Sequence, residues 1–300
     1  MTPKAKITSD LLAQASLFTL TQRKGGNRKK ADLGRVETEA DKGQLHLTKQ
    51  LIESDQYRAL TRYLNESKKW CLMRCMPSFI KNGVYVVRLD MIREFEVKLK
   101  ADIEYMRTVL IPEFKATYPA KIRDAEMRLS DQFDLRDYPD ASLFDSAFGI
   151  EWGWISFGVP DNVPKDVQER EYAKLQEKIL DAEKEIKAAL RIAFGELVEK
   201  AVEKLKVKPG EKPPVFRDTM IDNFTEFFQT FRARNLMDDE ELNRVVGKAQ
   251  EILTKITPDA LRFRITIREK TAKAFEEVKR EVDQLISDAP SRKFRLEEED

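Results

Sequence analysis

The stretch YAKLQEKILDAEKEIKAALRIA, residues 172–193, determines the class of fold. Its apolar side chains recur alternately every three and every four residues, at Tyr172, Leu175, Ile179, Ala182, Ile186, Ala189 and Ala193. This spacing is a heptad seam, and it predicts one long helix over residues 166–206. At a rise of about 1.5 Å per residue, that helix would be about 60 Å long. The seam can pack within the chain or against a second copy. Its alanines allow close approach but bury little area, so packing within the chain is favoured.

Apolar residues at helical spacing predict further helices within residues 44–76 and 89–129, with a kink or break at Pro112, and three more after the proline-rich loop at 208–214. Thr257 followed by Pro258 is typical of a helix start. Strand signals are short: residues 84–87 are the best candidate, and residues 18–20 and 154–158 are weaker ones. The sequence therefore predicts a mainly α fold, an elongated multi-helix bundle with a long coiled-coil-like helix and at most a small β element.

The composition changes along the chain and predicts three parts. Residues 1–44 form an irregular, basic N-terminal segment. Residues 45–290 form a single elongated helical domain, in which residues 130–168, rich in aromatic residues and proline, are an ordered connection packed on the helices. Residues 291–300 form a charged tail.

The charge balance excludes a general attraction to polyanions. Lysine and arginine number 54 against 53 acidic residues, so the net charge is close to +1. A nucleic-acid or membrane contact would therefore need a local patch. No stretch reaches the ~18 apolar residues of a membrane span, and the N-terminus has no signal-peptide core. Only two cysteines are present, which excludes a disulfide framework, so we expect a cytoplasmic protein without membrane contact.

Motifs of the common catalytic and cofactor sites are missing from the sequence. His46 is the only histidine, and Cys71 and Cys75 have CxxxC spacing, so neither a usual zinc site nor a His-dependent triad can be assembled within one chain. No phosphate-binding GxxxxGK[ST] or GxGxxG motif occurs. Asp161 with Glu185 and Lys187 has a superficial nuclease-like order, but the last two fall in the heptad helix. We therefore expect no enzyme, no cofactor, and no catalytic or metal-binding residue.

The strongest local signal is a basic segment before residue 31. It contains Arg23, Lys24, Arg28, Lys29 and Lys30, with no acidic residue among them. Five cations could neutralise phosphates and give salt-dependent nucleic-acid binding. The alternatives are a solvated loop or a loop that docks on an acidic partner. A second feature is the row Phe224, Phe227, Phe228 and Phe231, which is more typical of a core, although Phe228 falls off the main stripe and is a candidate exposed contact.

Several short elements resemble those of one uncharacterised family. They are Arg74-Cys-Met-Pro-Ser-Phe-Ile-Lys-Asn-Gly-Val-Tyr-Val-Val87, Lys115-Ala-Thr-Tyr-Pro119, Phe133 before Tyr138-Pro139, Phe148 with Trp152 to Pro160, Phe216-Arg-Asp218 before Asn223, and Arg234-Asn-Leu236 before Asp238-Asp239. In this order they are similar to a domain of unknown function from bacteria, phages and mobile elements, over roughly residues 45–290. The resemblance implies a helical, non-enzymatic accessory protein. Some members of the family are associated with genes for MoxR-like AAA+ ATPases and von Willebrand A-type partners. It implies no catalytic residues.

Together these observations predict a helical adaptor or scaffold that acts through protein–protein contacts, with an AAA+ ATPase in a phage or mobile-element setting as a candidate partner. The alternative is a nucleic-acid-binding accessory protein that uses the basic loop 23–30. An enzyme with a dispersed carboxylate site is the least favoured hypothesis. A homo-oligomer remains open.

Overall fold

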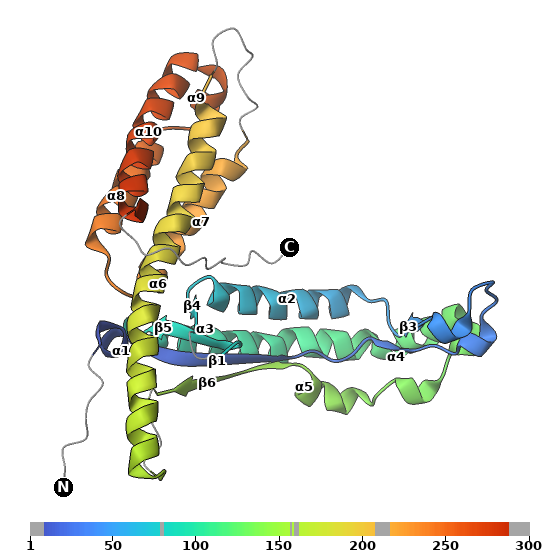
Figure 1. Ribbon diagram of the computed structural model, residues 1–300. Helices are drawn as coiled ribbons and strands as arrows, with labels where there is room; N and C mark the ends of the chain where they lie inside the picture. The colour runs from blue at the N-terminus through green and yellow to red at the C-terminus, as the bar shows by residue number, and fades with distance from the viewer. Residues whose placement is uncertain (1–8, 79–80, 157, 159–161, 208–216, 288–300) are drawn as a thin grey trace. The chain divides into compact units, whose positions relative to one another are not determined.

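The computed structural model describes residues 9–78, 81–156, 158, 162–207 and 217–287 (Figure 1). The predicted loop at 208–214 and the charged tail at 291–300 lie outside the described residues. The chain divides into two compact units: unit 1 comprises residues 1–18, 73–91 and 154–300, and unit 2 comprises residues 19–72 and 92–153. The sequence-based boundaries at residues 44 and 290 stay a prediction.

The β content corrects the predicted fold class. The protein is 70% helical, but it also contains a four-stranded antiparallel sheet and a two-stranded sheet, so the expectation of at most a small β element was wrong. The larger sheet has the order β4-β5-β1-β6, formed by Met76–Pro77, Val84–Arg88, Ala15–Arg23 and Gly149–Ile155. The smaller sheet pairs β2 (Arg28–Lys30) with β3 (Thr48–Gln50). Strand β5 confirms the strand predicted at residues 84–87.

The physical reason for the error lies in β1 and β6, which each have residues in both units. Strand β1 lies inside the segment that we expected to be irregular. It carries buried Leu17 and Phe18, whereas Ser16 between Ala15 and Leu17 is only half-buried. Its partner β6 is more than a hundred residues away in the chain. Pairing across that separation leaves no signal in local periodicity, and a nine-residue strand is not stable without it.

Unit 1 contains most of the helices. They are α1 (Asp10–Gln14), α6 (Lys165–Leu205), α7 (Thr219–Arg234), α8 (Glu240–Thr254), α9 (Pro258–Phe263) and α10 (Ile265–Ser287), together with the 3-10 turn Leu89–Met91. The predicted long helix is confirmed as α6. The start predicted at Thr257 is also confirmed, because the Thr257 side chain accepts a hydrogen bond from the Ala260 amide and Pro258 occupies the first turn.

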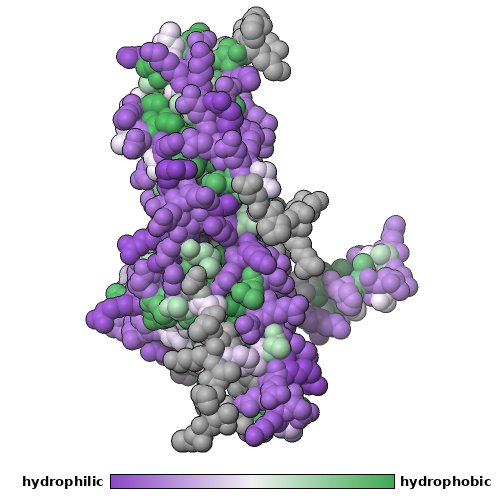
Figure 2. Space-filling model, turned by 60° about the vertical axis from the view of Figure 1, so that its left-hand side comes forward, coloured by the Kyte–Doolittle hydropathy of each residue, from purple (hydrophilic) through white to green (hydrophobic). Residues whose placement is uncertain are grey.

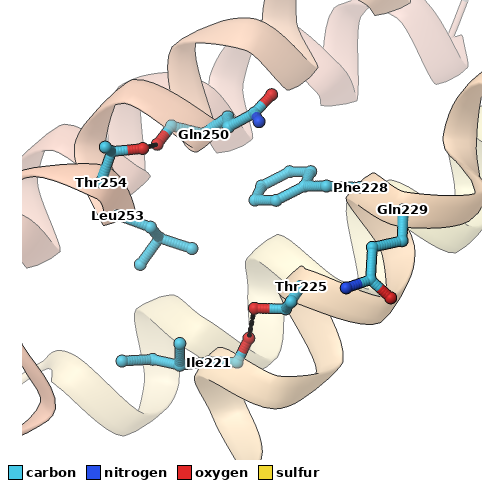
Figure 3. Close-up of a pocket in the computed structure, with 7 residues that line it drawn as sticks. All are labelled: Ile221, Thr225, Phe228, Gln229, Gln250, Leu253 and Thr254. Atoms are coloured by element: carbon cyan, nitrogen blue, oxygen red, sulfur yellow. Dashed lines mark hydrogen bonds between the residues drawn. The ribbon is translucent and has the colours of Figure 1, made fainter.

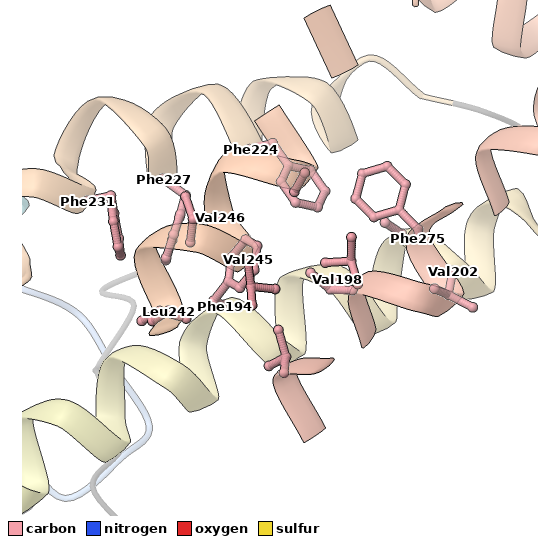
Figure 4. Close-up of a cluster of buried hydrophobic side chains, with 14 of the residues drawn as sticks. Phe194, Val198, Val202, Phe224, Phe227, Phe231, Leu242, Val245, Val246 and Phe275 are labelled. Atoms are coloured by element: carbon pink, nitrogen blue, oxygen red, sulfur yellow. The ribbon is translucent and has the colours of Figure 1, made fainter. Parts of the chain in front are cut away.

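Two successive stretches of α6 belong to different hydrophobic cores of unit 1. In the middle of the helix, Ala182, Ile186 and Ala189 pack with residues of α1 and the sheet, which include Leu11, Leu17, Met76 and Val86. The heptad seam therefore packs within the chain over these residues, as its alanines predicted. The C-terminal half of α6 packs against α7, α8 and α10, and Figure 4 shows the core that they share around Phe194, Val198, Phe224 and Phe275. The face drawn in Figure 2 is mainly hydrophilic, with apolar side chains in small groups.

Unit 2 contains α2 (Asp55–Leu72), α3 (Ile92–Tyr105), a π-helical turn (Met106–Leu110), α4 (Ile111–Leu129) and α5 (Phe144–Ala147). Short 3-10 turns occur at Leu33–Arg35, Lys42–Gln44, Ser130–Gln132, Leu135–Asp137 and Ala141–Leu143. The irregularity predicted at Pro112 appears as the π-helical turn directly before α4. Phe144 stacks on Phe114 at 4.9 Å and meets Tyr118 at 4.7 Å, ring centre to ring centre. Aromatic residues of the predicted connection therefore do pack on the helices.

Candidate functional site

A shallow groove runs between α7 and α8 in unit 1 (Figure 3). It has a volume of about 390 Å³ and is lined by Ile221, Thr225, Phe228, Gln229, Gln250, Leu253 and Thr254. The threonine hydroxyls are already used, because Thr225 donates to the Ile221 carbonyl at 2.9 Å and Thr254 donates to the Gln250 carbonyl at 2.7 Å. No ionisable side chain lines the groove. The groove can therefore bind apolar surface, but it offers no group for acid–base chemistry.

Phe228 lines this groove and also packs against the core of unit 1. Phe224, Phe227 and Phe231 are buried in the core of unit 1. Phe228 is only half-buried, and its ring centre lies 5.7 Å from that of Phe224. The sequence-based interpretation of Phe228 as an exposed contact stays a prediction, because the ring packs on the core as well as lining the groove.

Gly247 lies on α8 next to the residues that line the groove. It lies one turn before Gln250 and two turns before Thr254, so the three residues share one side of the helix. A methyl group added at Gly247 would meet no atom within 4 Å. Glycine inside a helix costs about 0.5–1 kcal/mol relative to alanine. Packing within the described structure does not require this glycine, and its absence of a side chain leaves the α8 backbone open to close approach.

Gln229 and Gln250 provide the hydrogen-bonding groups of the groove that are available to a ligand. Their side-chain amides make no hydrogen bond to any part of the chain that the structure describes. Each amide can donate two hydrogen bonds and accept through its oxygen. A partner lying in the groove would therefore meet apolar side chains along its centre and adaptable amides at its edge.

The structure separates the five predicted basic residues. Arg23 ends β1 and forms an ion pair with Glu151 of β6. Lys24 donates a hydrogen bond to the Asn65 side chain of α2. These two cations are therefore already engaged within unit 2.

Arg28, Lys29 and Lys30 form β2, and all three are exposed. Lys29 is paired in register with Lys49 of β3, whose ammonium lies 2.7 Å from the Asp137 carboxylate. Side chains alternate along a strand, so Arg28 and Lys30 share one face of the ribbon and Lys29 lies on the other. The basic run is therefore not one continuous surface. Among the described residues, no ion pair or hydrogen bond engages the side chains of these three cations.

The most chemically varied cluster is buried in unit 2. The Asp102 carboxylate accepts hydrogen bonds from Tyr63 at 2.8 Å, from Ser67 at 2.6 Å and from Lys98 at 2.6 Å. Burial, and then the bond to Asp102, raise the pKa of Tyr63 above its usual range. Ser67 is itself buried, so a substrate could not reach its hydroxyl. The cluster satisfies a buried carboxylate and links α2 to α3.

A second buried ionic cluster joins three helices of unit 1. The Arg191 guanidinium of α6 donates to both Asp239 oxygens, at 2.6 and 3.0 Å, and to Glu241 at 2.8 Å. It also donates to the Leu285 carbonyl of α10 at 2.7 Å. Asp239 meanwhile accepts a hydrogen bond from the Leu242 amide and so caps α8. Periodicity gave no sign of this cluster, because Arg191 and Asp239 look like ordinary surface charges in the sequence.

The predicted absence of metal and catalytic sites stays an expectation. In the described part of the chain, no group of three or more His, Cys, Asp or Glu residues could hold a metal ion. His46 is exposed, whereas Cys71 and Cys75 are buried and form no disulfide. Glu185 and Lys187 of the nuclease-like order lie on α6, and Asp161 lies outside the described residues. No described helix combines the length and apolarity needed to cross a bilayer.

Comparison of the chain with protein-family models, with curated proteins and with solved structures finds no match.

Proposed function

We propose that this protein is a non-enzymatic adaptor that acts through protein–protein contacts, and that the groove between α7 and α8 receives an amphipathic helix of its partner. The observation that carries the proposal is the chemistry of the lining, which is apolar at its centre, neutral throughout and without an ionisable side chain. Such grooves take helices that present apolar side chains at positions i, i+3, i+4 and i+7.

Three features of the groove favour a helical partner. Ile221, Phe228 and Leu253 provide the apolar contact, and each Leu- or Phe-sized partner side chain that they bury would contribute about 1.5–3 kcal/mol. Gly247 lets a partner helix approach the α8 backbone closely. Gln229 and Gln250 can bond to polar groups at the edge of that helix. A cytoplasmic AAA+ ATPase of a phage or mobile element is the candidate partner, on the strength of the family resemblance.

Site-specific photo-crosslinking in the native host tests this proposal. A benzoylphenylalanine at Gln250 should give a defined adduct with one partner protein, and that adduct should disappear when Gly247→Leu places a bulky side chain between the partner and the α8 backbone. The matched control is benzoylphenylalanine at Arg244, which is exposed on α8 and lies about 120° around the helix from Gln250 at ~100° per residue. Equal adducts from both positions would reject the groove as the docking site. Hydrolase or nuclease activity that follows the protein through purification would reject the non-enzymatic role.

A second candidate function is nucleic-acid binding by β2. It is favoured by the exposure of Arg28, Lys29 and Lys30, whose side chains have no ionic partner among the described residues. The triple variant Arg28→Glu, Lys29→Glu, Lys30→Glu should then abolish binding to double-stranded DNA or RNA. Unchanged binding would reject this account.

A further inference from the structure

The turn between α9 and α10 presents an exposed aromatic ring at one end of the unit 1 helices. Five successive residues, 262–266, are exposed. Phe263 is 80% exposed and Ile265 is 55% exposed, whereas the preceding Leu261 is fully buried. A phenylalanine with this exposure gains little from folding, since most of its side chain stays in water. The ring is therefore available to a ligand.

The same region is locally basic, although the whole chain is nearly neutral. Between Lys255 and Lys273 the sequence holds six lysines and arginines but only two acidic residues. Two of the six cations are engaged within the fold. Arg262 pairs with Asp218 and with Asp259, and Arg268 is buried with its Nε donating to the Leu205 carbonyl at 3.2 Å.

The other four, Lys255, Arg264, Lys270 and Lys273, are exposed, and their side chains make no ion pair or hydrogen bond within the described ranges. The last three lie at or after the turn. On α10, Thr266, Lys270 and Lys273 are spaced by four and then three residues, so they share one face of the helix. At about 1.5 Å per residue, the cations from Arg264 to Lys273 extend over about 14 Å. Arg264, Lys270 and Lys273 therefore form an extended row of positive charge that starts at the residue after Phe263.

We propose that Phe263, Arg264, Lys270 and Lys273 form a binding site for single-stranded nucleic acid. An unpaired base would stack on the exposed Phe263 ring, and the phosphates that follow it would meet Arg264 and then the two lysines. Bases in a duplex are already stacked and cannot reach a protruding ring, so the site selects single strands. This inference goes beyond the adaptor role and does not depend on the α7–α8 groove.

An anionic membrane is the competing partner, because Phe263 and Ile265 could also enter a bilayer surface. Two observations favour the nucleic acid. The cations continue along the side of α10, away from the apolar residues at the turn. In addition, Arg262, the residue before Phe263, pairs with the carboxylates of Asp218 and Asp259, which would repel a flat anionic surface pressed against this turn. A linear strand can pass these carboxylates and still reach the cations.

Fluorescence anisotropy of the full chain with a labelled oligothymidylate provides the test. Phe263→Ala should weaken binding by about 5- to 150-fold, the range expected for losing one base–aromatic stack, whereas Phe263→Trp should retain it. The triple variant Arg264→Glu, Lys270→Glu, Lys273→Glu should abolish binding. For the unmodified chain, the slope of log K against log salt should be about −2, since each phosphate neutralised on a single strand contributes about −0.7.

The matched control is the triple variant Arg28→Glu, Lys29→Glu, Lys30→Glu, which changes the net charge by the same amount at another surface. It should leave oligothymidylate binding unchanged. Equal losses from the two triple variants, or no effect of Phe263→Ala, would overturn the proposal. So would binding of phosphatidylserine vesicles that needs Phe263 while oligothymidylate does not bind. Since all the substituted side chains are exposed, unchanged circular dichroism spectra and melting curves should accompany each variant.

Discussion

Replacing Arg191 by methionine should break a buried bidentate ion pair of unit 1. The Arg191 side chain is 7% exposed and that of Asp239 is 2% exposed, so the bidentate pair lies almost wholly out of water. Methionine retains most of the aliphatic volume but none of the donors. The substitution therefore leaves the Asp239 carboxylate buried with only the Leu242 amide and the more distant Lys187 ammonium, at 3.8 Å, nearby.

The expected cost is about 3–5 kcal/mol, the usual consequence of leaving one member of a buried ion pair without its partner. This is a large part of the ~5–15 kcal/mol by which a typical domain is stable. The double variant Arg191→Met, Asp239→Asn should be more stable than Arg191→Met alone, because a neutral amide is cheaper to bury than an unpaired carboxylate. The control is Arg244→Met on the exposed side of α8, which should change stability by less than about 0.5 kcal/mol.

The pH dependence gives an independent check of the same pair. Burial alone would raise the pKa of Asp239, but the bonds from Arg191 and from the Leu242 amide outweigh it and lower that pKa below its ordinary value. A carboxylate with a lowered pKa in the folded state contributes stability above its unfolded-state pKa, about 3.9, and that stability is lost as the pH falls through the folded-state pKa. The difference in the free energy of unfolding between Arg191→Met and the unmodified chain should therefore be largest at pH 7 and should shrink below about pH 4.

Urea denaturation followed by circular dichroism, together with hydrogen exchange of the α8 amides, measures these effects. The exchange data assign the loss of stability to unit 1, since unit 2 does not contain the pair. A loss below about 1 kcal/mol at pH 7 would refute the reasoning, as it would show that the pair contributes no more than an exposed ion pair does. If the difference in unfolding free energy stays the same down to pH 2, the Asp239 carboxylate is not the group that causes it.

Three further outcomes are expected. Gly247→Ala should stabilise unit 1 by about 0.5–1 kcal/mol in the same urea assay, because its methyl group meets no atom, and a destabilised variant would show that the space is not open. Asp102→Ala should destabilise unit 2 by about 1–3 kcal/mol by leaving buried hydroxyl donors without an acceptor, and a neutral result would mean that Tyr63 and Ser67 find water instead. Burial raises the pKa of Tyr118 to about 12, so an ultraviolet titration of Tyr118→Phe should match that of the unmodified chain up to about pH 11. If Tyr118→Phe instead lost a phenolate transition near pH 10, the raised pKa would be contradicted.

The helices were predictable because their signal is local. The heptad spacing from Tyr172 to Ala193 predicted a helix over residues 166–206, and α6 spans Lys165–Leu205. The N-cap at Thr257 could also be predicted, since the side chains of Ser, Thr, Asp and Asn before a helix accept hydrogen bonds from its first amides. In each case the residues that determine the structure are within one or two turns of each other.

The sheet and the charged sites were less predictable because they depend on partners far along the chain. β1 becomes a strand only through β5 and β6, so the irregular composition of its neighbourhood was misleading. The five basic residues looked like one patch, but the alternation of side chains along β2 and the pairing of Arg23 with Glu151 divide them. The groove position of Phe228 could not be predicted from spacing, because residues 224, 227, 228 and 231 all fall on one face of a helix and only the packing of α8 leaves the Phe228 ring half-buried.

The arrangement of α6 in two cores has a consequence for how the chain is synthesised. The C-terminal half of α6 exposes Phe194, Val198 and Leu205 until α10, the last described helix, is available to cover them. Roughly 80 residues separate the end of α6 from the end of α10, which corresponds to about 4–16 s of translation at ~5–20 residues per second. During that interval the nascent helix presents an apolar stripe to the ribosome surface and to any chaperone nearby. A ribosome that stalls before α10 would therefore release a chain with this stripe uncovered, a ready substrate for quality-control proteases.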